Sequence, residues 1–115
     1  MRTTENDLVL DREQLRSVTL DDPKLMQEIL LALIEDTGRQ SGLIVAAFAD
    51  GDSQRAIRLA RNSARACDNV GASRTAGVLR SLERAAAASD VPSGTAAIAS
   101  LGAEIDRLRT EVSKL

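Results

Sequence analysis

The sequence contains no histidine, tryptophan or tyrosine, and it has a single phenylalanine and a single cysteine. Without histidine, no imidazole ring can act as a nucleophile or as a proton carrier. The lone Cys67 cannot form an internal disulfide, which is typical of a protein of the reducing cytoplasm. No apolar run is long enough to cross a bilayer, so we expect no membrane association.

What remains is a chain of 115 residues rich in alanine and branched aliphatic residues. This length is sufficient for one domain with a single core. Small and aliphatic side chains favour closely packed helices. We expect residues 1–7, which are mostly polar, to form a flexible N-terminus, and residues 8–115 to form one helical domain.

Cap and turn residues delimit segments in which apolar residues recur at helical spacing. These segments cover about residues 11–20, 22–50, 52–70, 72–89 and 98–115. No segment shows the alternation of a strand. The pattern therefore predicts an all-α fold, an antiparallel four-helix bundle with a short leading helix.

The sequence predicts how the first helix begins and which of its residues share one side. Asp11 is predicted to cap the short helix, with Gln14 as its reciprocal partner. Leu15 and Val18 are expected on one side of that helix.

The positions of glycine and proline predict where helices bend, pack closely or end. Gly38 and Gly42 interrupt the long second segment and indicate a bend or a close approach of another helix, within a segment that we expect to form one curved helix. Pro92 and Gly94, together with Asp90, are expected to separate the fourth helix from the fifth.

Charge is unevenly distributed along the chain. Residues 1–50 carry five basic and ten acidic side chains, whereas residues 51–84 carry seven arginines and three acidic side chains. On a helix that turns by about 100° per residue, one narrow sector opposite the apolar stripe contains Gln54, Arg58, Arg61, Arg65 and Asp68. The simplest interpretation is a solvated helix face, with Arg65 and Asp68 paired locally.

Several motifs, in order, resemble those of the histidine-containing phosphotransfer (HPt) domains of bacterial phosphorelays. They are LDREQLRSV, DDPKLMQEILLALIEDT, AFADGD, and NVGA followed by LRSLERAAAASD. The resemblance covers roughly residues 8–115. It implies a helical bundle that presents its second and third helices to a receiver domain.

The resemblance also shows what this chain has lost. Counting back from Asn69, the phosphorylated histidine of the family falls on Arg61, its lysine on Ala64 and its glycine on Arg65. A phosphorelay nucleophile needs a free ring-nitrogen lone pair, and a guanidinium offers only donors. We therefore predict that the chain cannot carry phosphate.

No other residue is expected to replace the histidine. Ser63 and Cys67 fall toward the apolar stripe, and Asp68 has no metal-ligand partner at useful spacing. We expect no catalytic residue, no metal site and no cofactor.

A docking role is then the leading hypothesis. The chain is predicted to bind the receiver domain of a response regulator or hybrid sensor kinase, as a non-catalytic adaptor, decoy or inhibitor. Its contacts are expected from Gln54, Arg58, Arg61, Ala64, Arg65 and Asp68, with Arg61 reaching the acidic pocket that the resemblance implies for a receiver.

Three other functions remain as alternatives at this point. An active phosphorelay carrier is the ordinary function of the HPt family, and we keep this assignment for the pathway but reject it for the chemistry, because the chain has no histidine to phosphorylate. A structural module could pair with a second copy through the long second helix or the apolar stripe from Ile98 to Leu115. Arg58, Arg61 and Arg65 form a row of arginines on one helix face, called the arginine row below. Nucleic-acid binding through this row is disfavoured, because the isoelectric point is about 5.1 and stacking aromatic residues are lacking.

Overall fold

The computed structural model describes residues 8–115, and within this range the chain forms five helices and no strand. The all-helical prediction is confirmed. The helices are α1 (Arg12–Val18), α2 (Pro23–Ala49), α3 (Ser53–Asn69), α4 (Ser73–Ala87) and α5 (Val91–Ser113). The N-terminus predicted to be flexible, residues 1–7, lies outside the described residues.

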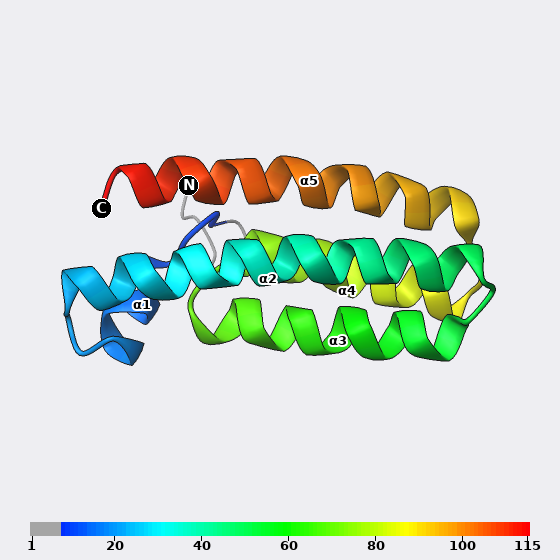
Figure 1. Cartoon of the computed structure of the whole chain (residues 1–115), viewed down its shortest axis with the longest axis horizontal. Coiled ribbons are helices and arrows are strands. Elements are labelled where there is room, and N and C mark those ends of the chain that lie inside the picture. The colour runs from blue at the N-terminus through cyan, green and yellow to red at the C-terminus, as the bar shows by residue number, and fades with distance from the viewer. Residues whose placement is uncertain (1–7) are drawn as a thin grey trace, which may run out of the picture.

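The four long helices pack around one core. Each is in contact with its neighbours in the pairs α2–α3, α3–α4, α4–α5 and α2–α5. Successive long helices reverse direction at each turn, and α1 lies at the end of the molecule where α2 begins (Figure 1). The large apolar side chains that are fully buried come from α1, α2, α4 and α5, whereas α3 contributes only small buried residues. These large residues are Leu15, Leu30, Ile44, Leu79, Leu82, Leu101 and Leu108.

Aspartates begin four of the helices. The Asp22 carboxylate accepts from the backbone N–H groups of Lys24 and Leu25 at the start of α2. Asp52 and Asp90 cap α3 and α5 in the same way. The hydroxyl and the backbone N–H of Ser93 both donate to Asp90, and these bonds lower the pKa of that carboxyl below its usual value.

The cap of α1 differs in part from the prediction. Asp11 does cap the helix, accepting from the N–H of Gln14 at 3.1 Å. The Gln14 amide, however, donates to the carbonyl of Asn69, and the Asp11 N–H donates to the carbonyl of Gly71. A tertiary contact with the α3–α4 turn thus replaces the reciprocal bond. Of the two residues expected on one side of α1, Leu15 is fully buried, whereas Val18 is 45% exposed because the short helix presents only Leu15 to the core.

The glycine and proline expectations are met in part. α2 is one continuous helix, as expected, but a Cβ at Gly38 or Gly42 would meet nothing from another helix within 4 Å, so the close approach expected there is wrong. α5 begins at Val91, before Pro92, so that Gly94 lies inside the helix. There a Cβ would come within 2.9 Å of the Phe48 ring, so the missing side chain makes room for the chain's one aromatic residue.

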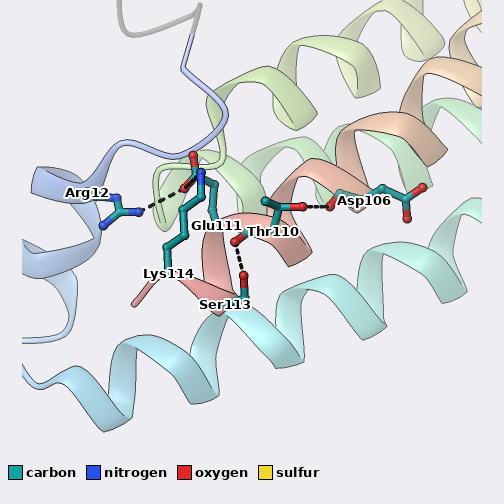
Figure 2. A network of polar contacts seen from close by, with 6 residues as sticks. All are labelled: Arg12, Asp106, Thr110, Glu111, Ser113 and Lys114. Carbon is teal, nitrogen blue, oxygen red and sulfur yellow. Dashed lines mark hydrogen bonds and ion pairs between the residues drawn. The ribbon is translucent and has the colours of Figure 1, made fainter.

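A polar network attaches α1 to the C-terminal end of α5. Figure 2 shows Arg12 reaching from α1 to Glu111 on α5, an ion pair of 3.0 Å. Lys114 lies 3.9 Å from the same carboxylate. Thr110 donates to the backbone carbonyl of Asp106 within α5. Because the Arg12 pair joins residues nearly at opposite ends of the chain, it helps to hold α1 against the C-terminal end of α5.

Candidate functional site

Arg61 lies near the middle of α3 on the side that faces α4. Its guanidinium donates to the Glu83 carboxylate across the two helices, with 3.1 Å between Nη2 and Oε2. The Arg61 side chain is 50% exposed and that of Glu83 is 26% exposed. A pair so open to water contributes only about 0–1 kcal/mol to stability. Arg61 is therefore held in place weakly and stays accessible.

Asp68 makes a second connection between the same helices. Its carboxylate forms an ion pair with Arg80 on α4. The simple interpretation of the sequence paired Asp68 with Arg65 instead, and that pairing is wrong. The two contacts run in opposite senses, since α3 supplies the cation in one and the anion in the other.

The rest of the predicted contact set divides into exposed and buried residues. Gln54, Arg58 and Arg65 are exposed on α3, as a docking face requires. Among residues 8–115, neither Arg58 nor Arg65 forms an ion pair. Ala64 is only 3% exposed and belongs to the core, because it lies on the edge of α3 that packs against other helices. The prediction that Ala64 is one of the surface residues that contact a partner is therefore wrong.

The two candidate nucleophiles on α3 are buried. Ser63 is 6% exposed and Cys67 is fully buried. Burial raises the pKa of the Cys67 thiol from 9.0 to about 11, against a smaller lowering effect of the Thr37 hydroxyl, which lies 3.9 Å from the sulfur. A buried thiol with a raised pKa is a poor nucleophile.

An open groove of about 300 Å³ lies on the other side of α3, against α2. It is lined by Asp36, Gln40, Leu59, Asn62, Ser63 and Ala66. Neither Arg61 nor Asp68 borders it. The arginine row and the groove therefore lie on two different sides of the exposed ridge of α3.

Within the described part of the chain, His, Cys, Asp and Glu side chains form no group of three that could hold a metal ion. None of the helices in that part is both long enough and apolar enough to cross a membrane.

A buried carboxylate lies elsewhere, between α4 and α5. Glu104 is 4% exposed, and its Oε2 accepts from Arg74 at 3.0 Å and from Arg107 at 2.6 Å. Its other oxygen, Oε1, is buried without a partner in the structure. The cluster holds α5 to the beginning of α4. There the backbone N–H of Arg74 also donates to the carbonyl of Leu8.

Sequence reasoning missed Glu83, Arg80 and Glu104. Glu104 carries a readable signal, because it stands three residues after Leu101 and four before Leu108, on the same side of the helix. The roles of Glu83 and Arg80 depend on the register between α3 and α4. No spacing within one helix reveals that register.

Comparisons with known proteins give one informative result. No family model and no curated protein matches the sequence. Among solved structures, the chain is similar to histidine-containing phosphotransfer protein B (HptB) from Pseudomonas aeruginosa PAO1, with a TM-score of 0.81 and 23% sequence identity over 92% of each chain. At this identity the likeness shows the fold: the chain has the helical fold of an HPt protein.

Proposed function

We propose that this chain is an antiparallel four-helix bundle with a short leading helix that serves phosphorelay signalling without carrying phosphate. In this proposal it binds the receiver domain of a response regulator or hybrid sensor kinase in the cytoplasm. The observation that carries the proposal is the half-exposed Arg61, at the position where the HPt motif requires histidine, in a chain with the HPt fold.

The chemistry of Arg61 separates binding from transfer. A guanidinium stays protonated and has no lone pair for attack on an aspartyl phosphate. It can still donate two parallel hydrogen bonds to a carboxylate, which suits an acidic pocket. Exposed Arg58 and Arg65 add positive charge on either side of it. Transfer is therefore lost while electrostatic attraction to an acidic partner is retained.

The test is a titration of purified receiver domains with this protein. Because the chain has no tryptophan or tyrosine, a fluorescence change from these residues reports on the receiver alone. We expect saturable binding that weakens as ionic strength rises, and a loss of at least about tenfold in affinity for Arg61→Glu and Arg58→Glu.

Arg109→Glu is the matched control. Arg109 is an exposed arginine on α5 with an acidic neighbour, Asp106, at 3.1 Å, and its reversal changes the net charge by the same amount. Its affinity should stay close to that of the parent. If Arg61→Glu and Arg58→Glu also bind like the parent, the arginine row is only a solvated face and the proposal fails.

A second function, pairing with another copy of the chain, is favoured by exposed apolar residues on α2. Leu31 is 51% exposed and Val45 is 44% exposed. Together with Gly38 they recur every seven residues and share one helix face. Light scattering at increasing concentration tests for this dimer. A titration of the dimer with a receiver then shows whether pairing excludes docking at Arg61.

A further inference from the structure

The positive charge of the molecule is concentrated on α3 and α4. Together these two helices bear seven arginines and only two acidic residues, a formal net charge of +5. α2 and α5 each have a formal charge of −1. One of these arginines, Arg74, is paired with Glu104 on α5, and the others remain. An acidic partner is therefore attracted to the side formed by α3 and α4, which differs from the face of the second and third helices that the resemblance to HPt domains implies.

The side chains of Arg61 and Asp68 also extend from α3 toward α4. Arg61 extends to Glu83, and Asp68 to Arg80, so both residues lie along the boundary with α4. Arg84, one residue after Glu83, is exposed, and within residues 8–115 it forms no ion pair. It donates only to the Ser81 hydroxyl, at 3.0 Å. The two ion pairs thus extend a surface centred on Arg61 onto α4, and Arg84 lies beyond them, where it borders a groove with Asp90 and Ser93.

We propose that the docking surface spans α3 and α4, and that Glu83 occupies the place that a carboxylate of the partner takes in the complex. Docking then exchanges an internal ion pair for an intermolecular one, and Glu83 sets the affinity by competing for Arg61. The partner's identity as an acidic receiver rests on the function proposed above.

The geometry of the pair makes this exchange feasible. Glu83 accepts from one terminal nitrogen of Arg61, through Oε2. A guanidinium has five N–H donors, so most of them are left for an incoming group. Both side chains are partly solvated, and water can replace either partner during the exchange. A bidentate carboxylate inside a desolvated interface would bind Arg61 more strongly than Glu83 does on the open surface.

The test removes the competing charge. Glu83→Gln should tighten receiver binding by about three- to tenfold relative to the parent. Asp106→Asn is the matched control, because it removes the acidic member of an exposed arginine pair on α5 and changes the net charge equally. The control should shift affinity by less than about twofold. Circular dichroism before each titration checks that both variants are folded.

A second variant tests the extension onto α4. Arg84→Glu should weaken binding by about fivefold or more, while Arg109→Glu should not. If Glu83→Gln binds like Asp106→Asn and Arg84→Glu binds like Arg109→Glu, the inference is overturned. The proposed function survives that result if Arg61→Glu still abolishes binding, and it fails if Arg61→Glu binds like the parent.

Duplex DNA serves as a nonspecific polyanion in a parallel titration. If Glu83→Gln tightens binding to DNA as much as binding to a receiver, the surface attracts any polyanion. That result would also overturn an exchange specific to a partner carboxylate.

Discussion

The backbone of Asp11 lies directly against Gly71. The Asp11 N–H donates to the Gly71 carbonyl at 2.7 Å, and a Cβ on Gly71 would lie 2.6 Å from the Asp11 carbonyl oxygen. Gly71 also has a φ of +88° in the turn between α3 and α4. This contact attaches the start of α1 to the turn that follows the arginine row, so the fold of the site depends on a residue without a side chain.

Gly71→Ala should lower the free energy of unfolding by about 2–4 kcal/mol. The left-handed backbone accounts for about 1–2 kcal/mol, and displacement of Asp11 with its hydrogen bond accounts for the rest. Gly51→Ala is the control, because Gly51 has a φ of +70° but nothing within 4 Å of a Cβ. It should cost only about 1–2 kcal/mol. Urea denaturation compares the two, and equal losses would show that the Asp11 contact contributes nothing.

Features local to one segment could be predicted from the sequence. The caps at Asp22 and Asp52 and the left-handed Gly71 follow from short-range rules, and the structure has them. Contacts between helices could not be predicted in this way. The Arg61–Glu83 pair depends on the register of α3 against α4, and Gln14 bonds Asn69 only after α1 has docked. The burial of Ala64 has the same origin, because the width of the exposed sector of α3 depends on how closely α4 packs.

Gly38→Ala and Gly42→Ala should each stabilise the protein. Both glycines are exposed inside α2, and the methyl group of an alanine at either position would meet no other atom within 4 Å. Alanine reduces the conformational freedom of the unfolded chain and favours the helix by roughly 0.5–1 kcal/mol at each position. Thermal unfolding of the single and double variants measures the gain. A loss of stability would indicate that α2 approaches another surface at these residues, as a dimer through α2 requires.

Stability should fall between pH 9 and 11 because of Cys67. In this window the thiol of the unfolded chain loses its proton, whereas the buried thiol, with its pKa raised to about 11, keeps it. The folded state therefore binds more protons, and the free energy of unfolding decreases as pH rises. A shift of about two pKa units corresponds to a loss of about 2–3 kcal/mol by the upper end of the window. Urea denaturation across this range should show a steeper decline for the parent than for Cys67→Ala, and parallel curves would contradict the burial argument.

Arg61→His should not restore phosphoryl transfer. The position lies within reach of Glu83, and a carboxylate next to an imidazole favours its protonated form, which lacks the free lone pair. If a receiver docks at Arg61 as proposed, Arg65 adds bulk at the position where the resemblance implies glycine, and buried Ala64 supplies no positive charge for the phosphoryl oxygens. We expect no labelling of Arg61→His from a phosphorylated receiver, and more labelling when Arg65→Gly and Glu83→Gln are added. Labelling of the single variant as strong as that of the triple variant would show that the surroundings of position 61 have stayed competent for transfer. The unaltered chain contains no histidine, so we expect no labelling of it. If it is labelled, another residue accepts the phosphate and the proposed loss of transfer is wrong.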